Sequence, residues 1–460
     1  MKLYIEGNIG RYYVQTLCLI FFPGAGFSER EEETAEGDAV RLTLHEDAQS
    51  YTAEAVMRHG GEQRSGTARE LRDGIDSDER IKKRAVGRAI FEAGAELFGI
   101  RPEWGILTGV RPAKLAEQLA ESARAQGLDG AREAERILTG DYLAAPEKAH
   151  LLTEVARNNS ALRRQVGSDG CSVYISIPFC PTRCAYCSFV SYSTPRLLSL
   201  IPDYLERLCS DIRALGRLLP RIGRRVDTVY IGGGTPTTLS AEQLDRLLGC
   251  LGECIDLSAL RSIGRSHTAE QFFRAYEAAA AQSFDCINTD LIAGLPGESG
   301  ESFIRSFDEV SALSPENITV HTFCVKRAAE LAERGGCYSR TGEDAGRGVA
   351  YSQRRCAELG YEPYYMYKQK NAVGGYENVG FSKHGKEGIY NILIMDEIHS
   401  IFALGAGAVT KLVSRSGGDM QRLFMPKYPY EYLAASPEEA ERALAEAAES
   451  FYRDRFDDAE

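Results

Sequence analysis

Alternating strand and helix patterns most limit how this chain can fold. Four short apolar runs typical of strands are separated by helical patterns. These runs are 173–177, 226–231, 286–293 and 318–323. Two of them end in glycine-rich turns, Gly232-Gly233-Gly234-Thr235 and Gly294-Leu295-Pro296-Gly297. Strands that alternate with helices favour parallel βα units, and such sheets place ligands at the carboxyl ends of their strands. The sequence therefore predicts an α/β domain with its ligand site at these turns.

The residues on either side of this pattern predict two further regions. Residues 1 to about 168 combine strand-like runs with helical patterns and form a predicted α+β domain, with 169–345 and 346–460 as the next two domains. The strand-like runs are 2–5, 40–44 and 51–57, and the helical patterns are 78–98, 113–126 and 146–165. The apolar run Val14–Phe22 is too short for a signal peptide or a membrane span, so we interpret it as a buried strand.

The last region, 346–460, has fewer clear patterns. Tyr361–Tyr367 is strand-like, a strand pair is expected around Tyr390–Ala403, and a final helix follows. Ser436 can cap that helix, and Pro437 suits its first position.

Composition excludes some classes of function. The chain has 66 acidic and 54 basic residues and a formal charge of −12, which argues against a nucleic-acid binder. We expect no export signal, and therefore a cytoplasmic protein whose 12 cysteines are thiols or metal ligands rather than disulfides.

Three of these cysteines are close together in the sequence. The motif Cys180-Pro-Thr-Arg-Cys184-Ala-Tyr-Cys187 follows the run 173–177 directly. Three thiolates in one loop can bind three irons of a four-iron cluster and leave the fourth iron open to a chelating substrate. A structural zinc site is the alternative, but it needs a fourth ligand, and His267 and His321 are distant in the sequence. Buried, unligated cysteines are the other alternative.

The cysteine spacing, with Tyr186 before the last cysteine, resembles the radical S-adenosylmethionine superfamily. The string Tyr174-Ile-Ser-Ile-Pro-Phe-Cys180 resembles its oxygen-independent coproporphyrinogen III oxidase-like branch, and other strings resemble the HemZ type of that branch. These strings are Leu107–Pro112, Gly294–Glu298, Tyr367–Asn371, Glu377–Gly380 and Gly405–Ala408. The resemblance covers essentially the whole chain and implies two cofactors, a 4Fe-4S cluster and S-adenosylmethionine.

The resemblance also implies roles for single residues. Tyr174, the catalytic candidate, would pack on the bound cofactor; a core tyrosine is the alternative. Gly232, Gly233, Gly234 and Thr235 would meet the methionine ammonium group, since glycine permits close approach, although a plain tight turn is also possible. Arg265 would pair with the cofactor carboxylate, or else lie on the surface. Asp290 would bind the ribose hydroxyls, and a charge inside an apolar strand favours such a role.

Two features depart from the family pattern. Phe189 stands where members known to decarboxylate have a fourth cysteine. Only Asp256–His267 separates two predicted helices, where the family has two strands and a helix. We therefore predict a partial (β/α) radical S-adenosylmethionine barrel that lacks two middle strands, with an α+β N-terminal domain and a C-terminal α+β extension. A gapped barrel would bind its cofactor weakly.

The resemblance implies the oxidative decarboxylation of two propionates of coproporphyrinogen III to vinyl groups, which gives protoporphyrinogen IX in heme biosynthesis. An electron donor such as a flavodoxin or ferredoxin would reduce the cluster. A tetra-carboxylate substrate needs cations, and the candidates are Lys326, Arg327, Lys368 and Lys370, whose alternative is a solvated surface. Two other functions stay open: a heme-binding chaperone that uses the same cluster, and a relic that binds only the cluster.

Overall fold

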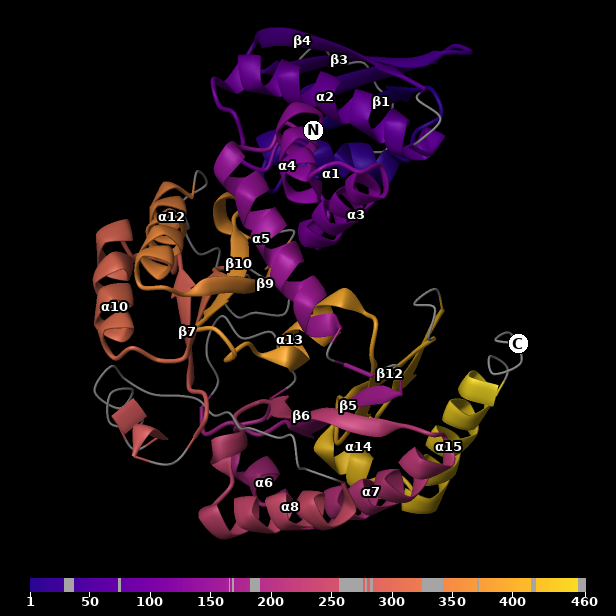
Figure 1. Ribbon diagram of the computed structural model, residues 1–460, viewed down its shortest axis with the longest axis vertical. Helices are drawn as coiled ribbons and strands as arrows, with labels where there is room; N and C mark the ends of the chain where they lie inside the picture. Colours follow the sequence, from indigo (N-terminus) through magenta and orange to yellow (C-terminus); the bar gives the residue numbers. More distant parts are fainter. Residues whose placement is uncertain are drawn as a thin grey trace. The chain divides into compact units, whose positions relative to one another are not determined.

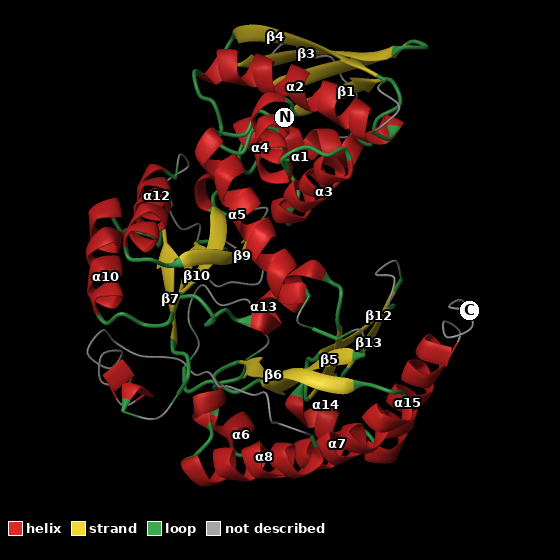
Figure 2. Cartoon of the chain, viewed as in Figure 1, coloured by secondary structure: helices red, strands yellow, loops and turns green. Residues whose placement is uncertain are grey.

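The computed structural model describes most of the chain, drawn as a ribbon in Figure 1 and coloured by secondary structure in Figure 2. The described residues are 1–28, 37–72, 76–164, 166–167, 169–182, 191–255, 276–277, 279–281, 284–324, 342–369, 372–414 and 419–453. They form a mixed α/β protein, which confirms the predicted class. No helix in these ranges is long and apolar enough to cross a membrane. The residues singled out above that lie outside the ranges are Cys184, Tyr186, Cys187, Phe189, Arg265, His267, Lys326, Arg327, Lys370 and Asn371.

The chain divides into two compact units. Unit 1 comprises Met1–Arg157, Arg340–Gly342 and Met366–Glu377. Unit 2 comprises Asn158–Ser339, Glu343–Tyr365 and Asn378–Glu460. Residues 366–377 belong to unit 1 although they lie in the predicted third domain, so sequence proximity alone does not define the units. The division into three domains stays a prediction.

Unit 1 contains a four-stranded sheet in the order β1-β2-β3-β4, and α2 packs on β3 and β4. β1 is parallel to β2, and the other neighbours are antiparallel. The strands are β1 (Lys2–Glu6), β2 (Ala39–Glu46), β3 (Ser50–His59) and β4 (Glu62–Leu71). The helices are α1 (Arg11–Phe21), α2 (Asp78–Phe98), α3 (Pro112–Ala125), α4 (Gly130–Gly140) and α5 (Pro146–Arg163), of which α5 continues into unit 2.

The prediction of a strand at Val14–Phe22 is wrong, because residues 14–21 lie in α1 and Phe22 is its C-cap. Val14, Leu17, Cys18 and Phe21 are its buried residues, and their spacing of three, one and three residues gives one apolar face of a helix. Local strand propensity is a weak signal beside this packing.

The predicted helix 78–98 is confirmed as α2. Ser77 caps it by accepting a hydrogen bond from the Arg80 backbone N–H, and Gly99 ends it with a positive φ of 66°. Both signals are local in the sequence, which explains why the bounds were predictable.

Unit 2 contains a five-stranded sheet in the order β13-β12-β11-β5-β6. The strands are β5 (Gly170–Ile177), β6 (Arg225–Gly233), β11 (Ser400–Leu404), β12 (Val409–Val413) and β13 (Met420–Phe424). β5 is parallel to both β6 and β11, whereas β11–β12 and β12–β13 are antiparallel. The predicted strands 173–177 and 226–231 are thus confirmed as parallel neighbours.

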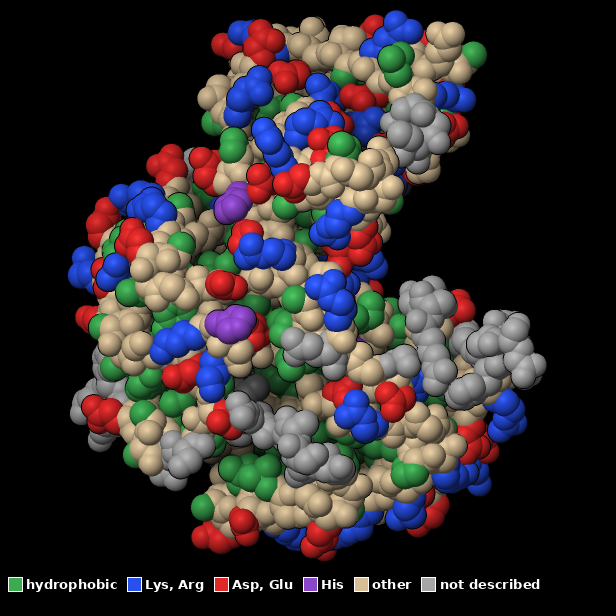
Figure 3. Space-filling view, in the orientation of Figure 1, with side chains coloured by type: hydrophobic (Ala, Val, Ile, Leu, Met, Phe, Trp, Pro, Cys, Tyr) green, Lys and Arg blue, Asp and Glu red, His purple; other side chains and the backbone are tan. Residues whose placement is uncertain are grey.

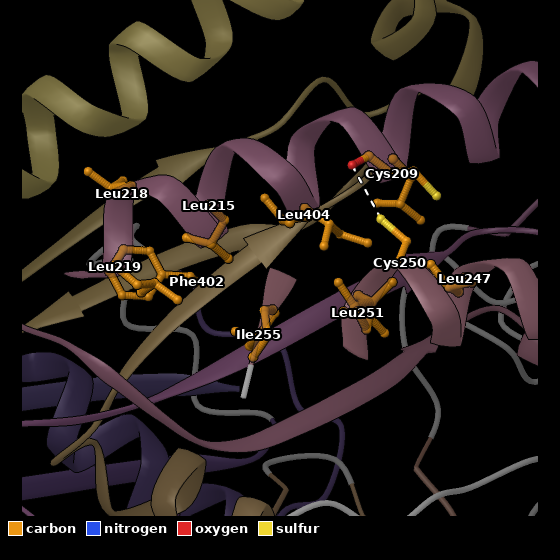
Figure 4. Close-up of a cluster of buried hydrophobic side chains, with 14 of the residues drawn as sticks. Cys209, Leu215, Leu218, Leu219, Leu247, Cys250, Leu251, Ile255, Phe402 and Leu404 are labelled. Atoms are coloured by element: carbon orange, nitrogen blue, oxygen red, sulfur yellow. Dashed lines mark hydrogen bonds between the residues drawn. The ribbon is translucent and has the colours of Figure 1, made fainter. Parts of the chain in front are cut away.

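Helices cover this sheet and enclose its core. They are α6 (Pro195–Leu198), α7 (Ile201–Arg221), α8 (Ala241–Cys254), α14 (Pro429–Ala434) and α15 (Pro437–Arg453), with the 3-10 turn η1 (Pro236–Thr238). Figure 4 shows apolar side chains of α7 and α8, among them Leu215 and Leu251, gathered with Phe402 and Leu404 of β11. The predicted cap of α15 is confirmed, since the Glu439 backbone N–H donates to Ser436 Oγ at 3.2 Å.

The second sheet has the order β7-β8-β10-β9. Its strands are β7 (Asn288–Ala293), β8 (Asn317–Thr322), β9 (Glu362–Lys368) and β10 (Glu377–Ser382). The neighbouring helices are α10 (Gly300–Ala312), α12 (Glu343–Glu358) and α13 (Ile389–Asp396), with the 3-10 turn η2 (Val373–Gly375). The expected strand pair around Tyr390–Ala403 is half wrong, because Tyr390 lies in α13 and only β11 is a strand there. Burial of Ile392 and Leu393 on one side of this helix outweighs the strand propensity of its isoleucines.

The strand order of the two sheets is relevant to the predicted barrel. β6 is the last strand of the five-stranded sheet, and β7 is the last strand of the four-stranded sheet, so the two are not hydrogen-bonded neighbours among the described strands. The shortened segment Asp256–His267 lies outside the described ranges. The partial barrel therefore stays a prediction.

Candidate cluster and cofactor site

The carboxyl ends of β5 and β6 meet because the strands are parallel and in register, with Ile177 opposite Gly233. Beyond the strands, the Gly234 N–H donates to Ile177 O at 2.8 Å and the Thr235 N–H donates to Phe179 O at 2.7 Å. The glycine-rich turn after β6 is thus joined to the start of the loop that carries Cys180. The structure brings together two predicted motifs that lie more than 50 residues apart in the sequence, as the 55-residue separation of Thr235 and Cys180 shows.

Cys180 is held at this meeting point with its thiol buried. Its backbone N–H donates to Tyr192 O at 3.0 Å, and its side chain accepts a hydrogen bond from Thr235 Oγ1 at 3.3 Å. Gly234 packs so tightly here that a Cβ would lie 2.5 Å from Phe179 O and 2.9 Å from Cys180 Sγ. A side chain at position 234 would therefore displace the backbone or the sulfur.

These contacts fit a thiolate ligand of a metal cluster. A hydroxyl donor next to the sulfur stabilises negative charge on it, and hydrogen bonds to cluster sulfurs tune the reduction potential. The glycine leaves room beside the sulfur that any other residue would fill. Within the described ranges no group of three potential ligands could hold a metal ion, but Cys184 and Cys187 lie outside those ranges.

Three tyrosines form a stack beside this turn. Tyr174 of β5 is opposite Tyr230 of β6, and their ring centroids are 5.9 Å apart at an interplanar angle of 11°. Tyr390 of α13 continues the stack, with its centroid 4.6 Å from that of Tyr230. Gly232 leaves space for the Tyr230 ring, because a Cβ at position 232 would lie 2.5 Å from that ring. The sequence predicted Tyr174 as a site residue. It did not predict Tyr230 or Tyr390, although Tyr230 lies only two residues before the predicted glycine-rich turn.

The phenol of Tyr174 stays protonated near neutral pH. Burial raises its pKa to about 12, and the neighbouring Tyr230 phenol acts in the same direction. Burial also raises the pKa of Tyr390. Tyr174 and Tyr390 therefore present neutral phenols, and Tyr174 can donate a hydrogen bond but does not supply a negative charge.

Asp290 lies on β7, in the other sheet of unit 2. Its Oδ1 accepts a hydrogen bond from Asn288 Nδ2 at 2.7 Å, and its Oδ2 is 3.7 Å from Nε2 of His321 on β8. A charged residue within this strand was expected to need a partner, and Asn288 and His321 of the same sheet provide it. Its predicted role at the ribose hydroxyls stays a prediction.

A buried polar trio lies at the amino end of β5. Ser172 Oγ is 3.0 Å from His399 Nδ1, and His399 Nε2 is 3.5 Å from Asp227 Oδ2. Ser172 is fully buried and His399 is 4% exposed, so the trio is placed to support the sheet rather than to attack a substrate. Burial lowers the pKa of His399 to about 4, and the positive charge of Arg224 acts in the same direction.

Of the four predicted cations, only Lys368 lies in a described range. It ends β9 and belongs to unit 1, where its ammonium group lies over the ring of Trp104. On the face shown in Figure 3, basic and acidic side chains are interspersed and do not gather in a single basic patch.

Comparison with known proteins gives three similarities. An oxygen-independent coproporphyrinogen-III oxidase-like protein HemZ from Bacillus subtilis is 34% identical over 379 residues, which are 73% of this chain and 75% of that protein. The heme chaperone HemW from Mycobacterium tuberculosis is 28% identical over 203 residues, 35% of this chain and about half (52%) of the chaperone. A solved coproporphyrinogen III oxidase from Escherichia coli, described as a radical SAM enzyme, is 20% identical with a TM-score of 0.41, and the match covers 55% of this chain and 67% of that one. No protein-family model matches the chain.

Proposed function

Because the chain belongs to the HemZ-like family of oxygen-independent coproporphyrinogen-III oxidase-like proteins, we propose that it is a radical S-adenosylmethionine oxidoreductase. Its proposed reaction is the oxidative decarboxylation of two propionates of coproporphyrinogen III to vinyl groups, a step in heme biosynthesis. The observation that carries the proposal is the buried Cys180 thiol, held by Thr235 where β5 and β6 end. The proposed place of action is the cytoplasm.

Cys180, together with Cys184 and Cys187, would hold a 4Fe-4S cluster through three thiolates. When bound, the cluster and S-adenosylmethionine would supply the one-electron chemistry that removes a hydrogen atom from the substrate. The residues of the chain position these groups. Thr235 would orient the Cys180 sulfur, and the backbone of Gly232–Gly234 would approach the amino acid part of the cofactor without interference from a Cβ.

The remaining residues would shape the cavity around the cofactor. The stack of Tyr174, Tyr230 and Tyr390 supplies an apolar aromatic wall that excludes water from the reacting groups. Arg265 would pair with the cofactor carboxylate, and Asp290 with the ribose. We further propose that β5, β6, β7 and β8 are the strands of a partial barrel. A flavodoxin- or ferredoxin-like protein would be the electron donor.

A heme chaperone is the second candidate function. Two observations favour it: the relatives include heme chaperones, and Phe189 replaces the fourth cysteine of decarboxylating family members. Such a protein would bind heme and would not release carbon dioxide from coproporphyrinogen III.

One pair of measurements separates the two functions. The full chain is reconstituted with iron and sulfide under anaerobic conditions and supplied with S-adenosylmethionine and a reductant such as dithionite, and 5′-deoxyadenosine and protoporphyrinogen IX are measured with and without coproporphyrinogen III. We expect both products only when the substrate is present, and neither product in a Cys180→Ala variant. Heme binding followed by absorbance, without protoporphyrinogen formation by the reconstituted wild type, would replace the enzymatic proposal with the chaperone.

A further inference from the structure

A row of three tyrosine rings begins at the loop that carries Cys180. The Cys180 backbone N–H donates to Tyr192 O at 3.0 Å. The Tyr192 ring centroid lies 5.8 Å from that of Tyr428, and the Tyr428 ring stacks on Tyr430 with centroids 5.3 Å apart and an interplanar angle of 14°. Tyr430 is 52% exposed. The row therefore leads from the backbone of a proposed cluster ligand to the surface of unit 2.

The segment that carries two of these rings is fixed at the carboxyl end of β5. Because β11 is parallel to β5, the turn Gly405–Ala408 that follows β11 lies at the same end of the sheet as the Cys180 loop. Two backbone hydrogen bonds join this turn to the segment 425–430, from Gly407 N–H to Pro426 O at 2.8 Å and from Met425 N–H to Ala408 O at 3.0 Å. The sheet thus holds the tyrosines beside the proposed cluster site.

The surface around the tyrosines is locally basic. Lys427 is exposed, with Nζ 5.5 Å from the centroid of the Tyr428 ring, and Arg196 is exposed four residues after Tyr192. Neither cation forms an ion pair with a residue of the described ranges. The neighbouring carboxylate, that of Glu431, accepts a hydrogen bond from the Tyr428 N–H at 3.4 Å. Two cations therefore stand against one carboxylate, on a chain whose formal charge is −12.

The end of β13 adds exposed apolar area next to these groups. Phe424 is 75% exposed and is paired with Val409 of β12, which is 36% exposed. The next pair on the same face of the two strands is Arg422 with Lys411, and both are within ion-pair distance of one carboxylate, that of Glu397. The aromatic surface comprises Tyr192, Phe424, Lys427, Tyr428 and Tyr430.

We infer that the aromatic surface binds the electron donor, an acidic, flavodoxin-like protein. This inference rests on the proposed function, because that function requires an electron for the cluster held by Cys180. One electron leaves the reduced flavin of the donor and enters the cluster, so the flavin is oxidised, the cluster is reduced, and no bond forms or breaks. A donor bound here lies next to the loop whose Cys180 N–H is bonded to Tyr192 O, which keeps the electron path short.

Two other occupants fit the aromatic surface less well. A small-molecule site encloses most of its ligand, whereas Phe424 and Tyr430 are largely open to solvent. A second copy of the chain would form a two-fold contact in which the same surface meets itself. The basic groups of the two copies would then repel each other. An acidic partner is attracted by the same charges, and tyrosine and phenylalanine side chains are enriched at the centres of protein interfaces.

Binding is measured with the full chain and a fluorescently labelled bacterial flavodoxin, by anisotropy, without S-adenosylmethionine or porphyrinogen. We expect saturable binding at low salt that weakens as salt is added, because salt screens the attraction between the two surfaces. Lys427→Glu should weaken binding about tenfold at low salt and less at high salt, and Tyr430→Ser should weaken it about fivefold at both. Arg305→Glu, which reverses an exposed arginine of α10, is the matched control and should leave the affinity unchanged.

A kinetic measurement separates docking from damage to the cluster site. After reconstitution, the loss of cluster absorbance is followed when reduced flavodoxin is mixed with the protein. In Lys427→Glu the second-order rate constant of this reduction should fall about tenfold at low salt. Dithionite is a small reductant that needs no docking surface, so it should reduce the same fraction of the cluster in wild type and variant.

Each outcome decides the inference. Equal affinity of wild type and Lys427→Glu for flavodoxin, or no saturable binding by the wild type, would overturn it. A wild-type dimer that dissociates in Tyr430→Ser, measured by sedimentation, would assign the surface to a second copy and also overturn it. The failure of the proposed function looks different. A chain that binds flavodoxin through Lys427 but makes no 5′-deoxyadenosine would disprove the proposed reaction and leave the docking surface in place.

Discussion

Replacing Gly234 with alanine tests the packing between the glycine-rich turn and the loop that carries Cys180. A Cβ at this position would lie 2.5 Å from Phe179 O and 2.9 Å from Cys180 Sγ, whereas ordinary contact begins at 3.4 Å. The carbonyl oxygen would have to move by about 0.9 Å and the sulfur by about 0.5 Å to relieve the contacts. The first of these atoms belongs to the backbone, so rotation of a flexible side chain cannot provide the space.

The size of the effect follows from these displacements. Forcing an extra methyl group into a packed site costs on the order of 1–3 kcal/mol of stability. Functional constellations require ligands within about 0.5 Å of their productive positions, so a sulfur displaced by that amount is a poorer ligand. We therefore expect Gly234→Ala to lower both the free energy of unfolding and the iron bound after reconstitution.

The measurements are denaturant unfolding of the protein without iron and iron content after anaerobic reconstitution. Gly249→Ala is the matched control, because Gly249 is an exposed residue of α8 and a Cβ there would have no neighbouring atom within 4 Å. Alanine there should raise helix stability by up to about 1 kcal/mol and leave iron binding unchanged. If Gly234→Ala unfolds at the wild-type denaturant concentration and binds as much iron as the wild type, the close packing argued from the structure is wrong.

Three further substitutions probe single interactions. Thr235→Val removes the hydroxyl that donates to Cys180, so after reconstitution a redox titration should give a more negative cluster potential while stability falls by only about 1 kcal/mol. Glu377→Gln leaves Lys148 with the half-exposed Glu103 as its carboxylate partner and should cost about 1.5–3 kcal/mol in denaturant unfolding; an unchanged midpoint would contradict the buried ion pair. Burial lowers the pKa of His399 from 6.5 to about 4, so the side chain stays neutral in the folded state while the unfolded chain takes up a proton. The free energy of unfolding should therefore fall by about 3 kcal/mol as the pH drops from 6.5 to 4. His399→Gln should flatten this part of the curve of unfolding free energy against pH.

The features that the sequence alone determined are those whose causes lie within a few residues. The start of α2 at Ser77 and its end at Gly99 follow from a side-chain cap and a residue that accepts positive φ. The order of the described strands and helices from Gly170 to Thr322 follows from apolar periodicity and glycine-rich turns. The resemblance of their motifs to a known family assigns Cys180, Tyr174 and residues 232–235 to one site. The pairing of β5 with β6 places them together.

Where local signals were ambiguous, tertiary packing decided the structure. The segment Val14–Phe22 has the composition of a strand, but its apolar residues fit one face of a helix, and burial of that face made it α1. Tyr390 likewise lies in a helix, α13, and it reached the site only because that helix packs against β6. No local pattern reveals which distant element will cover such a face.

Only the tertiary structure could bring Lys368 to Trp104. The sequence places them in separate regions and shows one as a lysine among several and the other as a lone tryptophan. Their contact, and the lowered pKa of Lys368, depend on the assembly of unit 1 from Met1–Arg157 and Met366–Glu377. Electrostatic effects follow distance in space and burial, not position along the chain, so the chemistry of this amine is a property of the fold.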